Sequence, residues 1–333
     1  NLRAGTVDLI IGTHKLLQKS VQFKDLGLLI VDEEQRFGVS HKERLKEISH
    51  GVDVLTLSAT PIPRTLALLM YGDLDVSILD ELPPGREPVD TFLVNESYRA
   101  RINAFIRKQV TEGHQCYVVC PAVEETEELN IKAAEVWAET LQQTVFPDLR
   151  IALLHGQMKG AEKEAAMAAF ARGEADVMVA TTVIEVGVDV PNATLMIIEN
   201  AERFGLSQLH QLRGRVGRGK AKSYCVLVSD AKGGDARARL DVLKKNHDGN
   251  AIAEEDLRLR GPGDFLQTGG EIRQHGDVRL PVAAGPGDVE ILAAAMEEAR
   301  GILERDPTLA RPEHAALRKA AEAALRDTAN TMN

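Results

Sequence analysis

Short, continuous apolar runs recur along this chain, each followed by polar residues and a helix-forming stretch. A continuous run, unlike an alternating one, indicates a parallel strand buried on both faces of its sheet. Two such runs lie near the front, at 26–31 and 52–57, and a shorter strand candidate lies at 7–11. The pattern predicts an α/β fold built on parallel sheets.

The same alternation of strands and helices repeats between residues 91 and 230. Right-handed crossovers would place its helices on both faces of a second parallel sheet. Strands are predicted at 91–94, 116–120, 150–154, 176–180, 194–198 and 223–228, and helices at 97–112, 127–144, 160–172 and 205–215.

Residues 83–90 contain three prolines and one glycine, a composition that favours an extended connection. We predict that they link a first domain, 1–82, to a second, 91–230. The remainder, 231–333, has a different pattern and forms a third region. Helices are predicted there at 236–245 and across 288–327 with a break near Asp306, and 252–263 contains a charged run that ends in Gly-Pro-Gly.

Charge and cysteine content limit the partners and the compartment. The formal net charge of −10 alone disfavours nucleic acid, but residues 211–222 concentrate five basic side chains. The three cysteines lack zinc-site spacing, so we expect buried thiols in a reducing compartment. No apolar run approaches the roughly 20 residues of a membrane helix, so we expect a cytoplasmic protein that does not bind a membrane.

Two polar clusters follow the first two predicted strands. The adjacent carboxylates Asp32 and Glu33 could hold a hydrated Mg²⁺ and polarise a water molecule, or they could cap a helix. Ser58 and Thr60 could report the state of a bound nucleotide through their hydroxyl groups, or they could form a turn ahead of a helix. Either cluster alone leaves both interpretations open.

The segment 180–191 follows another predicted strand. Thr181 and Thr182 could offer hydroxyl and backbone N–H groups to DNA phosphates. Gly187 permits close backbone approach. Asp189 could bond a ribose hydroxyl or an arginine of the next motif.

The run Gln-Leu-Arg-Gly-Arg-Val-Gly-Arg at 211–218 is the strongest functional signal. We place Arg215 and Arg218 three apart on one face of a predicted helix, where two guanidinium groups match a γ-phosphate and its transition-state charge. Gly214 and Gly217 would clear space for another surface. The alternative is a basic helix facing solvent, but two glycines within a helix cost about 1 kcal/mol each relative to alanine.

The four motifs occur in an order that resembles superfamily 2 helicases, with motifs II, III, V and VI. The resemblance implies RecA-like lobes, the first incomplete, that bind ATP and Mg²⁺. It implies that Asp32 holds Mg²⁺ through water and that Glu33 activates the attacking water. The other implied nucleotide contacts are Gln211, Arg215 and Arg218 at the transferring phosphoryl group, with Ser58, Thr60, Gly187 and Asp189 nearby. The implied DNA contacts are Thr13, His14, Thr181 and Thr182.

Within that superfamily the chain resembles the RecG branch-migration helicases, at 59–67, 71–77, 81–86 and 198–210. This resemblance implies a monomeric translocase on branched duplex DNA that remodels stalled forks and Holliday junctions in recombination and repair, with single-strand-binding protein as a partner. Residues 12–18 and 32–39 are closer to the related Mfd transcription-repair coupling factors, so an Mfd-like role is the alternative enzyme.

Both families carry a helical hairpin and loop that couple nucleotide state to movement on duplex DNA. The resemblance assigns Arg239 and Arg260 to this translocation module, and Gln274 to its loop. The segment 267–272 is longer here than in the family pattern.

The sequence contains no Gly-x-x-x-x-Gly-Lys-Ser/Thr loop to cradle phosphates. We therefore expect truncation upstream of residue 1, and we expect that this chain alone does not hydrolyse ATP. The alternative from another class is a non-catalytic DNA-binding remnant that kept the second lobe.

Overall fold

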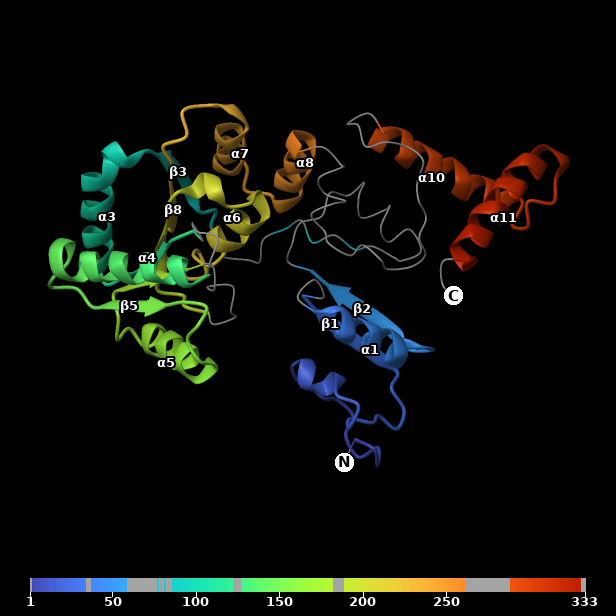
Figure 1. The fold of residues 1–333 in the computed structure, drawn as a ribbon, viewed down its shortest axis with the longest axis horizontal. Helices are drawn as coiled ribbons and strands as arrows, with labels where there is room; N and C mark the ends of the chain where they lie inside the picture. The colour runs from blue at the N-terminus through green and yellow to red at the C-terminus, as the bar shows by residue number, and fades with distance from the viewer. Residues whose placement is uncertain are drawn as a thin grey trace. The chain divides into compact units, whose positions relative to one another are not determined.

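The computed structural model describes residues 2–33, 37–58, 77, 79, 81, 86–121, 127–181, 189–260 and 288–330 (Figure 1). These residues divide into two compact units, Asn1–Pro61 and Ile62–Asn333. The domain boundaries expected near residue 82 fall among residues outside the described ranges and stay a prediction.

The second unit is built on a six-stranded parallel sheet with the order β3-β8-β7-β4-β6-β5. All six predicted strands are confirmed, each to within one residue. They are β3 (Asp90–Val94), β4 (Gln115–Val119), β5 (Ile151–Leu154), β6 (Val177–Ala180), β7 (Ala193–Ile198) and β8 (Tyr224–Val228).

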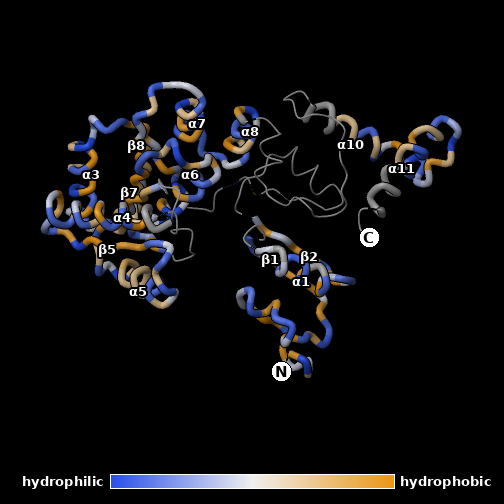
Figure 2. Tube along the Cα trace, in the orientation of Figure 1, coloured by the Kyte–Doolittle hydropathy of each residue, from blue (hydrophilic) through white to orange (hydrophobic). Residues whose placement is uncertain are grey.

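Helices cover both faces of this sheet, and alternate side chains of each strand enter one core or the other (Figure 1). Tyr117 of β4 packs on the side of α5, α6, α7 and α8, whereas Cys116 packs on the side of α3 and α4. The strands β5 and β7 are hydrophobic along their length (Figure 2). The helices are α3 (Arg99–Thr111), α4 (Glu127–Thr140), α5 (Gly160–Ala171), α6 (Leu206–Arg213), α7 (Gly234–Lys245) and α8 (Gly249–Arg260).

The first unit has β1 (Leu28–Asp32) and β2 (Asp53–Leu57), which pair in parallel, with η1 (His14–Leu17) and α1 (Val39–Ser49). The expectation that its strands are buried on both faces is wrong for the described residues: Leu28 is 55% exposed and Leu55 47%. The strand expected at 7–11 is also absent there, and Ile11 is 89% exposed. Parallel strands become buried only when further strands and helices cover them, and this described unit supplies two strands and few helices.

The last two described helices are α10 (Asp288–Arg305) and α11 (Ala315–Asn330), with the predicted break between them confirmed. The Asp306 carboxylate accepts hydrogen bonds from the backbone N–H groups of Ala310 and Arg311 and contacts His314 Nδ1 at 2.8 Å. The backbone bond from Arg311 and the bond from His314 lower the pKa of Asp306 to about 2. Among the described helices, none is long and apolar enough to span a membrane.

The three cysteines are free thiols, as expected. Cys116 and Cys225 are buried and Cys120 is partly buried. Burial raises the pKa of Cys225 and of Cys120 to about 12, so both thiols stay protonated at neutral pH.

Candidate functional site

The arginine run begins on a helix but does not stay on it. Helix α6 ends at Arg213, so Arg215 and Arg218 lie in the turn that follows. The expectation that these two arginines share a helix face is therefore wrong. Gly214 is the C-cap of α6, and Gly217, which lies between the two arginines, has a left-handed φ of +76°, so the backbone from Arg215 to Arg218 is not helical. We call residues 214–219 the arginine turn.

Two glycines let the arginine turn approach neighbouring segments of the chain closely. A Cβ on Gly217 would lie 2.8 Å from Val89 Cγ2, just ahead of β3. A Cβ on Gly219 would lie 2.3 Å from the carbonyl oxygen of Pro191, just ahead of β7. The space predicted for Gly217 is thus filled by the chain itself, which fixes the turn against the sheet.

Arg218 is held by two partners and remains partly accessible. Its Nε donates to the Gly214 carbonyl oxygen at 3.1 Å, and its Nη1 lies 3.4 Å from Asp189 Oδ1. An arginine of the next motif was one of the two partners considered for Asp189, and the structure shows that contact with Arg218. The Arg218 side chain is 30% exposed, so a ligand can reach its guanidinium.

The Tyr117 ring is buried in β4, in the middle of the sheet, within electrostatic range of these groups. Burial raises the pKa of the Tyr117 phenol to about 12, while the positive charges of Arg215 and Arg218 oppose the rise and Asp189 adds to it. Two guanidinium groups and one carboxylate therefore act on one buried hydroxyl group. The structure brings Arg215, Arg218 and Asp189 together on one side of the sheet.

Arg213 has a different role from its neighbours. It is buried, with 4% of its surface exposed, and its Nη1 donates to the carbonyl oxygens of Leu243 at 2.7 Å and Asn246 at 2.8 Å. Its Nη2 contacts His210 Nδ1 at 3.2 Å. Arg213 thus ties α6 to the C-terminal end of α7, where unpaired carbonyl groups attract a cation.

Sequence reasoning missed Arg213 as a distinct residue, although a signal existed. Arg213 lies four residues after Leu209 and seven after Leu206, on the buried stripe of α6. A cation at such a position must have internal acceptors. Burial lowers the pKa of Arg213, and burial followed by the charge of Arg213 lowers the pKa of His210 to about 4.

The carboxylates of the first unit lie at one edge of its sheet with Ser58. Asp32 ends β1 and is exposed, and it pairs in register with Leu57, the residue before Ser58. Glu33 has a φ of +53°, an uncommon conformation for a residue other than glycine, and its N–H donates to the Leu57 carbonyl oxygen. Helix α1 is capped by Gly38, so these carboxylates do not cap it.

The remaining predicted site residues are distributed as follows. Thr13 precedes η1, and the His14 ring lies 5.5 Å from the His41 ring. Thr181 follows β6 and is 5% exposed. Arg239 Nη2 donates to the Glu202 carbonyl oxygen at 3.5 Å. Gln211 lies in the last turn of α6. Four predicted site residues lie outside the described residues, namely Thr60, Thr182, Gly187 and Gln274, and so does the side chain of Arg260.

A charged cluster that the sequence did not predict lies beyond the carboxyl end of β7. Arg99 donates to both carboxylate oxygens of Glu199, at 2.6 and 2.7 Å, and to Glu96. Its guanidinium also lies over the Trp137 ring, 5.2 Å from the centroid. Burial disfavours this cation, but Glu199 and Glu96 outweigh it and raise the pKa of Arg99. The cluster joins α3 and α4 to the sheet edge.

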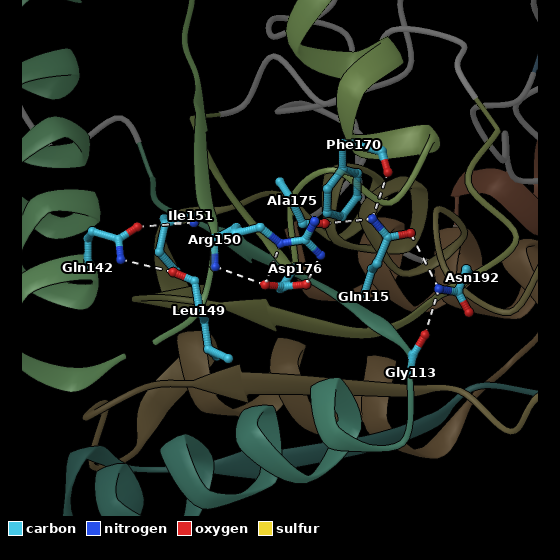
Figure 3. Close-up of polar contacts among 10 residues, drawn as sticks. All are labelled: Gly113, Gln115, Gln142, Leu149, Arg150, Ile151, Phe170, Ala175, Asp176 and Asn192. Atoms are coloured by element: carbon cyan, nitrogen blue, oxygen red, sulfur yellow. Dashed lines mark hydrogen bonds and ion pairs between the residues drawn. The ribbon is translucent and has the colours of Figure 1, made fainter. Parts of the chain in front are cut away.

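Polar residues at the amino ends of the strands form a second unpredicted network, which is structural (Figure 3). Gln115 Nε2 donates to the carbonyl oxygens of Phe170 at 2.6 Å and Ala175 at 2.8 Å. Arg150 and Asp176 form an ion pair at 2.5 Å. These side chains bond to backbone groups or to each other, so they hold the strand ends in place. No group of three or more His, Cys, Asp or Glu side chains in the described part of the chain could hold a metal ion.

Three family models match consecutive parts of the chain. Residues 1–69 match the DEAD/DEAH box helicase model, and residues 98–220 match the helicase conserved C-terminal domain. Residues 246–331 match the model of ATP-dependent DNA helicase RecG, domain 3, C-terminal. The matches agree with the order of motifs along the sequence.

Curated relatives and solved structures agree with these models. The ATP-dependent DNA helicase RecG of Synechocystis is 51% identical over 92% of this chain and 37% of the relative, and that of Escherichia coli K12 is 48% identical over 93% and 45%. A structure of RecG bound to a three-way DNA junction has a TM-score of 0.66 and 44% identity, covering 89% of this chain and 37% of that one. Yeast Dbp5 bound to RNA, at TM-score 0.50 and 13% identity, shows the fold alone.

The chain spans less than half the length of these RecG relatives. The high identity confirms the resemblance to RecG and does not favour the Mfd alternative. By its sequence, its parallel-sheet RecA-like fold and its arginine turn, this chain belongs to the RecG helicases of superfamily 2.

Proposed function

We propose that the protein carrying this chain is an ATP-dependent DNA helicase that translocates on branched duplex DNA. The observation that carries the proposal is the arginine turn, which brings Arg215, Arg218 and Asp189 together on a sheet of the RecG type. Two cations beside a single carboxylate leave a net positive charge that suits a polyphosphate. Membership of the RecG family supports the same activity.

The first unit supplies carboxylates that fit a Mg²⁺–nucleotide complex. Asp32 is exposed at the end of β1, and Glu33 follows in a conformation that turns the chain at that point. Mg²⁺ is usually bound by one or two carboxylates plus water and substrate phosphates, and it neutralises charge on the phosphate oxygens. In the proposal Asp32 would hold the ion through water, Glu33 would accept a proton from the attacking water, and Ser58 and Thr60 would respond to the nucleotide.

The second unit supplies the cations that stabilise the transferring phosphoryl group. Arg218 would exchange its 3.4 Å contact with Asp189 for the γ-phosphate, a charge-assisted partner with shorter hydrogen bonds. In the proposal Arg215 and Gln211 would assist at the same group, and Asp189 and Gly187 would contact the nucleotide. An arginine in this role contributes about 10³–10⁵ in rate in related enzymes.

The substrate follows from family membership. A RecG relative was solved with a three-way DNA junction, so we propose forks and Holliday junctions as substrates here. Thr13, His14, Thr181 and Thr182 would contact the DNA, and Arg239, Arg260 and Gln274 would couple nucleotide state to translocation. A monomer acting in the cytoplasm, with single-strand-binding protein as a partner, completes the proposal.

The proposal is tested with the natural full-length protein and two DNA substrates of equal mass. Forked DNA should stimulate ATP hydrolysis at least about tenfold more than linear duplex, and fork unwinding should require ATP and Mg²⁺. Binding of forked DNA without hydrolysis would instead favour the non-catalytic DNA-binding module. The 333-residue chain alone is the matched control, and we expect it to bind DNA without hydrolysing ATP.

A further inference from the structure

The segment that leads into β3 lies against the arginine turn. Arg86 Nη2 donates to the Gly214 carbonyl oxygen at 3.2 Å, across 128 positions of sequence. Arg218 Nε donates to the same oxygen at 3.1 Å. One carbonyl group at the end of α6 therefore joins the incoming segment to the arginine proposed to reach the phosphate.

A second contact fixes the same segment. The position of a Cβ on Gly217 would be 2.8 Å from Val89 Cγ2 and 3.8 Å from the Glu87 carbonyl oxygen. The backbone N–H of Asp90 then donates to the Ser223 carbonyl oxygen at 3.1 Å. Residues 86–90 thus contact the arginine turn at both Gly214 and Gly217, so a shift of this segment would disturb the turn.

The positive charges of Arg86 and Arg218 indicate that their shared contact with the Gly214 carbonyl orients the turn more than it stabilises the fold. Two guanidinium groups that share one acceptor repel each other, and Asp189 offsets this on the Arg218 side. A neutral side chain at residue 86 would avoid the repulsion. An arginine at residue 86 is explained if it holds the arginine turn, and therefore Arg218, in one orientation.

We propose that Arg86 is a positioning residue that orients Arg218 through the shared Gly214 carbonyl. The proposal rests on the ATP-driven function proposed above. Arg86 also lies in the predicted linker, 83–90, so a change in the linker would reach Arg218 through one carbonyl group. Arg86 would then make phosphoryl transfer sensitive to linker conformation without touching the nucleotide.

The first test compares Arg86→Ala and Arg86→Lys in the natural full-length protein by DNA-stimulated ATP hydrolysis. Arg86→Ala should lower kcat about tenfold and leave the KM for ATP within about twofold, since only transition-state contacts change. Arg86→Lys keeps one donor and should recover kcat to within about threefold. The matched control is Arg107→Ala, because Arg107 Nη2 also donates to a carbonyl oxygen at 3.2 Å, that of Val145, on the other side of the sheet. It should leave kcat unchanged.

The second test is a double-mutant cycle with Arg218→Lys, which keeps a cation and residual activity. If Arg86 acts through Arg218, adding Arg86→Ala to Arg218→Lys should lower kcat less than about twofold further. An equal tenfold loss in both backgrounds would mean a general structural role and would overturn the proposal. So would a near-normal kcat for Arg86→Ala in an active enzyme.

Hydrogen exchange on the 333-residue chain gives a readout that needs no activity. In Arg86→Ala the amides of residues 215–218 should exchange at least about fivefold faster, while those of β4 stay unchanged. Unchanged exchange in the turn contradicts the proposal. If the wild-type full-length protein shows no DNA-stimulated hydrolysis, the proposed function itself fails and this role fails with it, whereas an active wild type with insensitive Arg86 variants rejects this role alone.

Discussion

At the scale of residues, the three arginines of one short run lie in two different surroundings. Arg213 is buried among carbonyl groups, whereas Arg218 is partly exposed beside Asp189. The sequence indicated that arginines matter in this run, but it assigned them by spacing on a helix. Arg213 is buried and holds the end of α7, whereas Arg218 is exposed enough to reach a ligand.

Replacing Arg213 with methionine should destabilise the second unit. The Leu243 and Asn246 carbonyl oxygens would lose their donor inside the protein, at about 1–3 kcal/mol for each unsatisfied group, less the relief of removing a buried cation. We expect a loss of roughly 2 kcal/mol in the free energy of unfolding, measured with denaturant. Arg107→Met, at an exposed arginine, is the control. A loss under about 0.5 kcal/mol would show that Arg213 does not hold the α7 end.

His210 should make the second unit sensitive to mild acid. Its pKa falls from 6.5 to about 4 on folding, so the unfolded chain binds more protons between these two pH values. The free energy of unfolding should therefore be highest above pH 6.5 and fall toward pH 4, by as much as about 3 kcal/mol. Denaturant midpoints of wild type and His210→Gln test this, with His114→Gln as control. Equal acid slopes in all three proteins would contradict it.

At the scale of elements, the sheet of the second unit was predictable and the site was less so. Six apolar runs predicted six strands because burial on both faces removes alternation. The prediction that Arg215 and Arg218 share a helix was wrong because spacing alone does not show that Gly217, between them, adopts a left-handed φ and packs on Val89. Asp189 and Arg218 meet through tertiary structure, so sequence could offer only alternatives for Asp189.

Gly217→Ala should cost more than backbone strain alone. Gly173 has nearly the same φ, +75° against +76°, but a Cβ there would meet nothing within 4 Å. Gly173→Ala should therefore cost about 1 kcal/mol from left-handed strain, and Gly217→Ala about 1–2 kcal/mol more from overlap with Val89. Thermal or denaturant unfolding measures both. Equal costs would mean that the turn is not packed against Val89.

At the scale of the whole molecule, the two units differ in how well they bury their strands. Central strands β4, β6 and β7 are fully buried, whereas β2 is exposed along its length. Apolar runs predicted strands in both units, but a run cannot say whether neighbours cover it. The difference predicts unequal stability, since a two-stranded sheet is marginal by itself.

The single tryptophan lets that difference be measured. Trp137 lies in α4 of the second unit, so its fluorescence reports that unit alone, whereas far-UV circular dichroism reports both. In denaturant the dichroism signal should begin to fall at a lower concentration than the fluorescence signal, because the first unit unfolds first. Coincident transitions would show one cooperative molecule and contradict the prediction.

The most direct measurement of the central claim is DNA-stimulated ATP hydrolysis by Arg218→Ala in the natural full-length protein, with affinity for forked DNA measured in parallel. Because Arg218 is held in the arginine turn by Gly214 and Asp189 with its guanidinium accessible, its removal should lower kcat by about 10³ or more and change DNA affinity less than about threefold. A near-normal rate would contradict the assignment of this turn to phosphoryl transfer, as would a loss of DNA binding that matches the loss of rate.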